Sequence, residues 1–156
     1  MRLTICAVGR LRRGPEAELV ADYARRFDRL GRGLGLGSLD VAEVEDRKGG
    51  GPTAEAVLLE RAIPQGALRV ALDERGQTLT SPQLAKRLAA WRDAGHRDAA
   101  FILGGADGLC PRLVEGADMV LSFGPMVWPH MLARVMLAEQ LYRAATILSG
   151  TPYHRA

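Results

Sequence analysis

The sequence predicts an α/β fold with a mostly parallel sheet, and two observations support this prediction. Short apolar runs, each about as long as one buried strand, recur along the 156 residues. Segments with the apolar spacing of amphipathic helices separate these runs, and such an alternation is typical of βαβ units in one open sheet. No repeat or linker interrupts the alternation, so we expect a single domain over residues 1–156.

Each expected element follows from a local pattern. Strands are expected where apolar residues run together or alternate, at residues 3–8, 39–44, 68–72, 99–103 and 119–123. Helices are expected between and after them, at residues 15–29, 53–63, from 81 onward and at 131–148. Pro15 and Pro82 suit the first turn of a helix, and Thr53 and Ser81 can cap one. From the residues alone, this order fits an ordinary flavodoxin-like sheet.

Three loops are candidate binding loops, because ligands in open α/β sheets sit beyond the carboxyl ends of strands. They follow the third, fourth and fifth expected strands and read "DERGQ" (73–77), "GGADG" (104–108) and "GPMVWPH" (124–130). Gly104 and Gly105 either only turn a corner or let a ligand lie against the backbone. Loops with little charge and one apolar ring, Trp128, suit a ligand such as adenine that main-chain groups can bind.

Several common motifs are absent from the sequence. The glycine loop lacks the spacing of the dinucleotide fingerprint and the G-K-[ST] of a phosphate loop, and no G-x-S-x-G occurs. The three histidines, His96, His130 and His154, lack zinc-ligand spacing, so no metal is expected. Cys6 and Cys110 lack metal or redox spacing, so we expect buried free thiols in a reducing cytoplasm.

Composition and charge leave the class of partner open. Hydrophobic residues are 47% and charged residues 25% of the chain, which is ordinary for a globular protein. No apolar run approaches the roughly 20 residues that cross a bilayer, so no membrane partner is expected. The net charge of +3 and a basic cluster at Arg10, Arg12 and Arg13 are compatible with nucleic-acid binding but do not require it.

Three stretches carry a specific resemblance. "LGGADGL", "WPHMLARVMLAEQLYRA" and the terminal "PYHR" resemble the RlmH family, bacterial SPOUT-class methyltransferases that modify N3 of a pseudouridine in 23S ribosomal RNA. The resemblance runs the whole chain, and residues 97–156 are its specific part. It implies S-adenosylmethionine as methyl donor, a C-terminal trefoil knot and a homodimer that acts on the ribosome.

The same resemblance implies where the donor binds. By position, the cofactor pocket falls on Leu72, Asp73, Gly104, Gly105, Gly124, Pro125, Met126, Val127, Trp128 and Pro129. On this reading the two glycines of the first loop let the adenosyl group lie against the backbone. The chain departs from the family at two positions, where Asp107 replaces the more frequent Glu and Val127 replaces the usual Thr.

Two residues near the start of the last expected helix are candidate catalytic residues. His130 can position the acceptor base or take its proton, because a helix N-terminus favours a neutral imidazole that accepts a proton. The alternative is that His130 only caps the helix. Arg134, one turn further on, can face the same site and bind phosphate or the pseudouridine edge. The alternative for Arg134 is a surface or dimer salt bridge.

The C-terminal tail is the candidate RNA-binding segment. Tyr153 can stack on a base, His154 lies beside it, and Arg155 can meet a phosphate. The resemblance places this tail near the donor site. The alternative is a tail that packs only on its own sheet.

The predicted function is transfer of a methyl group from S-adenosylmethionine to N3 of a pseudouridine in 23S ribosomal RNA, on the assembled ribosome in the cytoplasm. A SPOUT methyltransferase that acts on transfer RNA is one alternative, although 156 residues leave little room for a separate RNA-binding domain. A non-catalytic ribosome-binding module and an unknotted flavodoxin-like nucleotide enzyme are two others.

Overall fold

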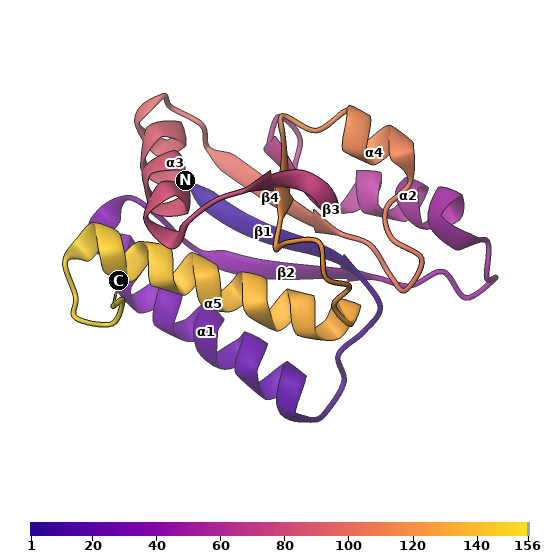
Figure 1. The fold of residues 1–156 in the computed structure, drawn as a ribbon, viewed down its shortest axis with the longest axis horizontal. Helices are drawn as coiled ribbons and strands as arrows, with labels where there is room; N and C mark the ends of the chain where they lie inside the picture. The colour runs from indigo at the N-terminus through magenta and orange to yellow at the C-terminus, as the bar shows by residue number, and fades with distance from the viewer. Residues whose placement is uncertain (156) are drawn as a thin grey trace.

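A computed structural model describes residues 1–155 and forms them into a five-stranded sheet in which every pairing is parallel (Figure 1). The strand order across the sheet is β2-β1-β4-β3-β5. The strands are β1 (Arg2–Val8), β2 (Leu39–Val44), β3 (Leu68–Thr78), β4 (Asp98–Leu103) and β5 (Met119–Ser122). The predicted α/β class with a parallel sheet is confirmed.

Both faces of the sheet are buried because side chains alternate between two cores. In β1, Leu3 and Ile5 face one core and Cys6 and Val8 face the other. Burial raises the pKa of the Cys6 thiol to about 11, so this cysteine is a protonated core residue.

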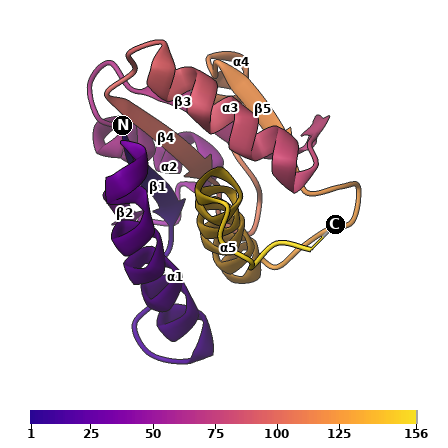
Figure 2. The same ribbon diagram turned by 90° about the vertical axis from the view of Figure 1, so that its left-hand side faces the viewer.

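Helices cover the two faces of the sheet. On one face lie α1 (Pro15–Gly31), which leads into the short helix η1 (Arg32–Leu34), α3 (Ser81–Asp93) and α5 (His130–Ser149). On the other lie α2 (Gly51–Ala62) and α4 (Pro111–Glu115). Helices α1 and α5 run side by side (Figure 1; Figure 2). Along residues 1–155, no helix combines the length and apolar character that crossing a membrane requires.

The helix boundaries differ from the predicted ones in ways that local chemistry explains. Helix α2 begins at Gly51 without a capping side chain, so Thr53 lies inside its first turn and is not its cap. Helix α3 is capped by Thr80, whose side chain accepts from the backbone of Gln83 in a reciprocal capping box, and Ser81 is its first residue. Helix α4 was not predicted, because its five residues are too few for a helical pattern.

The third strand is longer than predicted. It was expected to end at Leu72, but β3 continues to Thr78 and pairs with β5 on both sides of a bulge. Leu72 and Gln77 both pair with Leu121, so the intervening residues are pushed out of the ladder. The stretch "DERGQ", expected as a free loop, is therefore a bulge held at both ends by the sheet.

The strand order also differs from a flavodoxin-like sheet, in which β3 would lie next to β1. Here β4 lies between β1 and β3, and β3 lies between β4 and β5. This order brings the carboxyl ends of β4, β3 and β5 together, which places all three candidate loops at one edge of the sheet. The trefoil knot stays a prediction.

Candidate functional site

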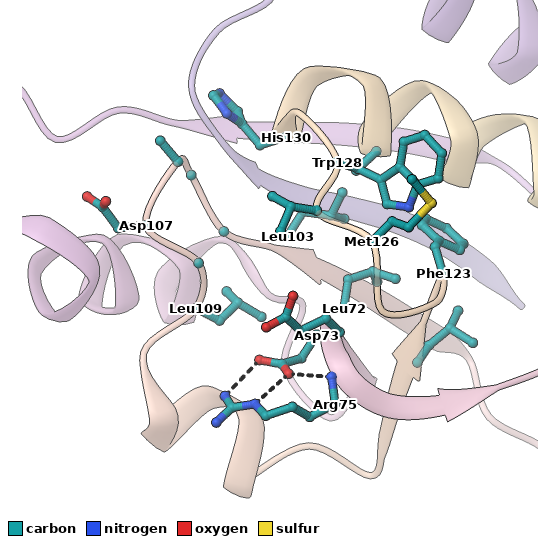
Figure 3. Close-up of a pocket in the computed structure, with 18 of the residues that line it drawn as sticks. Leu72, Asp73, Arg75, Leu103, Asp107, Leu109, Phe123, Met126, Trp128 and His130 are labelled. Atoms are coloured by element: carbon teal, nitrogen blue, oxygen red, sulfur yellow. Dashed lines mark hydrogen bonds and ion pairs between the residues drawn. The ribbon is translucent and has the colours of Figure 1, made fainter.

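A cavity of about 470 Å³ opens at the carboxyl ends of β3, β4 and β5 (Figure 3). Three segments form its walls: the bulge of β3, the glycine loop after β4 and the loop between β5 and α5. Because the three strands are parallel neighbours, their ends converge at this edge. The volume suits a nucleotide-sized ligand.

Most of the predicted donor-binding residues line this cavity. Those in its wall are Leu72, Asp73, Gly104, Gly105, Gly124, Met126, Val127 and Trp128, together with the predicted catalytic residue His130. Among the described residues, Pro125 and Pro129 belong to the same loop but are not in the wall, and neither Arg134 nor the tail residues Tyr153, His154 and Arg155 reach it.

Gly104 and Gly105 are required first by the packing of the glycine loop itself. A Cβ added at Gly104 would lie 2.5 Å from the carbonyl carbon and oxygen of Gly108. One at Gly105 would lie 3.2 Å from Val8 Cγ1 and 3.4 Å from a carboxylate oxygen of Glu55. Both Cβ positions therefore face protein, which differs from the expectation that the missing side chains make room for a ligand. The narrow loop presents its backbone to the cavity.

The loop after β5 is fixed at its start and exposed at its middle. Gly124 has φ +102°, a conformation that favours glycine, and its N–H donates to Ser122 Oγ at 3.0 Å. The buried Ser122 hydroxyl also donates to the carbonyl of Glu74 at 3.0 Å, which ties this loop to the β3 bulge. Val127, at the position where the resemblance predicts threonine, is 87% exposed, so its side chain makes little contact within this chain.

A carboxylate stands in the wall at the β3 bulge. The Asp73 side chain is 11% exposed and accepts two hydrogen bonds from the Arg75 guanidinium, at 2.9 and 3.0 Å, and one from the Arg75 backbone (Figure 3). The hydrogen bonds from Arg75 hold the pKa of Asp73 below its usual value, so the group is anionic at neutral pH. An oriented carboxylate can accept from hydroxyl groups or attract a cation.

Arg75 was not among the predicted site residues, although the "DERGQ" stretch that contains it was a candidate binding loop. An aspartate two residues before an arginine is common on any surface. Only the bulge turns both side chains to the same wall.

The cavity also has an apolar wall. Leu103 and Leu109 come from the strand and loop around the glycines, and Leu121 and Phe123 come from β5 and the residue after it. Figure 3 shows Phe123, Met126 and Trp128 together on one side of the cavity, with Asp73 on another. An apolar surface beside main-chain groups and one carboxylate suits a flat, uncharged ring joined to hydroxyl groups.

His130 is the first residue of α5 and lies in the cavity wall. Within the described chain, no side chain caps the N-terminus of α5, so His130 does not act as its cap. Its Nε2 atom lies 3.8 Å from the position that a Cβ on Gly9 would take, beside the end of β1. The imidazole therefore stands between the cavity and the loop after β1.

Arg134 lies one turn further along α5 but turns away from the cavity. Its side chain is fully buried and donates to Glu43 at 2.8 Å and to the carbonyls of Val8 and Gly9 at 2.8 and 2.9 Å. Its Nε is buried without a partner among the described residues. Arg134 thus joins α5 to the ends of β1 and β2, a contact that sequence reasoning missed because Glu43 lies 91 residues away.

The tail packs back onto α5. The Tyr153 hydroxyl donates to Glu139 at 3.0 Å, and its ring meets that of Tyr142 edge-on, with centroids 4.8 Å apart. Arg143 lies 4.8 Å from the Tyr153 ring centroid and 3.3 Å from the Nδ1 atom of His154. Burial and the hydrogen bond to Glu139 raise the pKa of Tyr153.

The tail follows the end of α5, whereas His130 is the first residue of that helix. The tail folds back to Glu139, in the middle of α5, but its residues do not line the cavity of their own chain. Arg155 is exposed.

Residues 1–155 contain no group of three histidine, cysteine or acidic side chains that could hold a metal ion. A glycine-loop cavity at the carboxyl edge of a parallel sheet, with an apolar wall, one carboxylate and one imidazole, defines an α/β protein that binds a nucleoside-like ligand.

Comparison with known families identifies the class more closely. The sequence model of a family described as "Predicted SPOUT methyltransferase" matches residues 1–154. The chain belongs to the SPOUT methyltransferase family, whose members use S-adenosylmethionine as methyl donor.

Curated relatives match over nearly the full chain. The chain is 68% identical to the Ribosomal RNA large subunit methyltransferase H of Dinoroseobacter shibae over 155 residues, 99% of both chains. It is 65% identical to the protein of the same name from Paracoccus denitrificans, with the same coverage.

A solved structure of a methylase family protein from Haemophilus influenzae Rd KW20 superimposes with a TM-score of 0.53 at 13% identity. The match covers 99% of this chain and 70% of the other. At that identity it supports the fold alone.

Proposed function

We propose that the protein transfers a methyl group from S-adenosylmethionine to 23S ribosomal RNA, at N3 of a pseudouridine on the assembled ribosome. The observation that carries the proposal is the convergence of the predicted donor-binding residues on one cavity in a chain 68% identical to a large-subunit RNA methyltransferase. Leu72, Gly104 and Gly124 lie in one cavity wall, although each comes from a different strand or from the loop that follows it.

The cavity fits the donor by the chemistry of its walls. Main-chain groups of the two glycine loops can bind the adenine edge, and the apolar wall at Leu103, Leu109 and Phe123 can cover its faces. The oriented carboxylate of Asp73 can accept hydrogen bonds from hydroxyl groups or attract the donor's positive charge. When bound, the donor supplies a methyl group activated by its sulfonium centre.

His130 is proposed to act on the acceptor. N3 of a pseudouridine is an imide nitrogen that becomes a good nucleophile when its proton leaves. The new bond joins N3 to the methyl carbon as the methyl–sulfur bond breaks, and the N3 proton passes to His130 or to water. The position of His130 in the wall, at the side of the loop after β1, supports this role. The buried contacts of Arg134 favour a role in positioning the site, without direct contact to the acceptor.

A homodimer is proposed because one chain leaves an apolar surface open around the start of α5. Met126, Val127, Trp128 and Leu132 are between 41% and 87% exposed, and they follow closely in sequence. A dimer also gives the tail a place at the site, since Tyr153, His154 and Arg155 do not line the cavity of their own chain and can complete the cavity of a partner. We further propose that residues 1–156 form one domain and that its C-terminal part forms a trefoil knot. We also propose a cytoplasmic location, because the proposed substrate is the ribosome.

The test is methyl transfer from radiolabelled S-adenosylmethionine to assembled ribosomes, isolated large subunits and transfer RNA, each from a strain that lacks the protein. The proposal expects label in 23S ribosomal RNA, with ribosomes preferred over isolated subunits. Label in transfer RNA would instead support the transfer-RNA alternative. Donor binding by calorimetry without any transfer would contradict catalysis, and absence of donor binding would favour a ribosome-binding module.

A further inference from the structure

The basic cluster after β1 takes no part in the cavity described above. Arg10, Arg12 and Arg13 lie in the loop between β1 and α1, and all three are exposed. Strand β2 is the parallel neighbour of β1, so its following loop emerges at the same edge. That loop carries Arg47 and Lys48, which are also exposed.

The two loops are held close together. Arg10 Nε and Arg47 Nε lie 3.6 and 3.9 Å from the same carboxylate oxygen of Glu45. The backbone N–H of Gly9 donates to the carbonyl of Val44 at 2.8 Å, which extends the pairing of the strands into the loops. We call these five residues the basic edge: Arg10, Arg12, Arg13, Arg47 and Lys48. Glu45 and Asp46 beside them balance only part of their charge.

An ion pair between the buried Arg134 and the half-buried Glu43 fixes the path of the loop after β1. Glu43 Oε2 accepts from the backbone N–H of Leu11 at 2.6 Å and from Arg134 at 2.8 Å. The other terminal nitrogen of Arg134 donates to the carbonyls of Val8 and Gly9. The exposed arginines therefore project from a loop whose backbone is anchored on both sides of Gly9, and a preorganised loop loses less entropy on binding.

The basic edge begins where the cavity ends. Nε2 of His130, a wall residue, lies 3.8 Å from the position of a Cβ on Gly9, the residue before Arg10. The glycine loop approaches the same place, since a Cβ on Gly105 would lie 3.2 Å from Val8 Cγ1. If the target nucleotide lies against His130, the nucleotides next to it in the RNA would therefore lie beside the basic edge.

We propose that the basic edge binds the phosphate backbone of the RNA strand that flanks the target nucleotide. This inference rests on the proposed function and adds the surface that holds the substrate. Arginine suits phosphate because its planar guanidinium donates two parallel hydrogen bonds. Such contacts fix the register of a nucleic acid without reading its bases. Such backbone contacts would complement the site at His130, which contacts only the target nucleotide.

The experiment compares two triple variants with matched charge changes. Arg10→Gln, Arg12→Gln and Arg13→Gln together remove most of the basic edge. The control replaces Arg29, Arg32 and Arg97 by Gln. These three are exposed and lie at the amino-terminal edge of the sheet, in α1, in η1 and before β4. Methyl transfer to ribosomes from a strain lacking the protein is measured from low to high salt, with donor affinity by calorimetry.

The basic-edge variant is expected to raise KM for ribosomes about tenfold or more at physiological salt, since each lost phosphate contact removes a counterion-release contribution. The slope of log KM against log salt concentration should decrease by about 2 to 3, since each phosphate contact contributes about 0.7 to 0.9 to this slope. The kcat and the donor affinity should stay within about twofold of the parent. An unchanged KM and salt slope, or an equal loss in the control variant, would overturn the proposal.

Binding to protein-free 23S ribosomal RNA shows whether the basic edge contacts RNA or a ribosomal protein. The proposal expects the basic-edge variant to bind this RNA more weakly, with the same reduction in salt slope. A raised KM on ribosomes with unchanged binding to free RNA would assign the basic edge to a ribosomal protein and contradict the inference. Failure of the proposed function looks different, because the unmodified protein would then transfer no methyl group to any ribosomal substrate.

Discussion

The fully buried guanidinium of Arg134 donates a hydrogen bond to Glu43 at 2.8 Å, across 91 residues of sequence. The pair connects α5 to β2, and the bonds from Arg134 to Val8 and Gly9 extend the connection to β1. His130 precedes Arg134 by one helical turn. The pair thus fixes where the imidazole lies relative to the loop after β1, which carries Arg10, Arg12 and Arg13 of the basic edge.

Arg134→Leu should destabilise the protein strongly, because it leaves a half-buried carboxylate and two carbonyl groups without their partner. Loss of one member of a buried ion pair costs about 3 to 5 kcal/mol. The measurement is urea unfolding at fixed protein concentration, since a dimer's stability depends on concentration. Arg26→Leu is the matched control, because its pair with Asp22 is exposed and worth about 0 to 1 kcal/mol. Equal effects of the two replacements would contradict the buried anchor.

Gly104→Ala should disturb the glycine loop and donor binding together. The added methyl group meets the backbone of Gly108 at 2.5 Å, so the loop must shift. We expect at least a tenfold loss of donor affinity by calorimetry and a stability loss of about 1 to 3 kcal/mol, as for overpacking elsewhere. Gly33→Ala is the control, because a Cβ there meets nothing within 4 Å. Unchanged donor affinity in Gly104→Ala would show that the loop does not form the donor site.

His130→Ala should lower the rate of methyl transfer without a comparable loss of donor affinity, since the proposed role concerns the acceptor. General-base assistance is worth about 100- to 10,000-fold. Single-turnover transfer to ribosomes measures the rate, and calorimetry measures the donor affinity. His96→Ala, in the exposed turn before β4, is the control and should match the parent. A rate loss below about threefold would leave His130 without a catalytic role.

Deletion of residues 153–156 should abolish methyl transfer while dimer formation and donor binding persist, because the tail lies outside the cavity of its own chain. Sedimentation, calorimetry and the transfer assay check the three properties. Tyr153→Phe removes only the hydrogen bond to Glu139 and keeps the ring against Tyr142, so it should retain most of the activity. Full transfer by the truncated protein would exclude the tail from the reaction.

Much of the fold was accessible from the sequence, because the strand cores are continuous apolar runs. Strand order and the β3 bulge were not, since both depend on which strand pairs with which, and Leu121 pairs with two residues of β3. The donor wall was predicted from family motifs. The residues themselves indicated only that loops at one edge of the sheet meet.

Residue-level roles were harder to predict because they depend on side-chain direction. His130 and Arg134 lie one turn apart on the same helix, which suggested a shared site. In the structure one reaches the cavity and the other points to Glu43. Nothing in the spacing of an acidic residue on β2 and an arginine on α5 signals such a long-range pair.

The most direct test of the account is the identity of the methylated nucleotide. Ribosomes from a strain lacking the protein are incubated with the protein and S-adenosylmethionine, and nuclease fragments of the 23S ribosomal RNA are analysed by mass spectrometry. We expect one added methyl group on N3 of a pseudouridine in assembled ribosomes, and we expect it to be absent when Gly104→Ala or His130→Ala replaces the parent protein. Methylation of another RNA class, or none with a donor-binding protein, would contradict it.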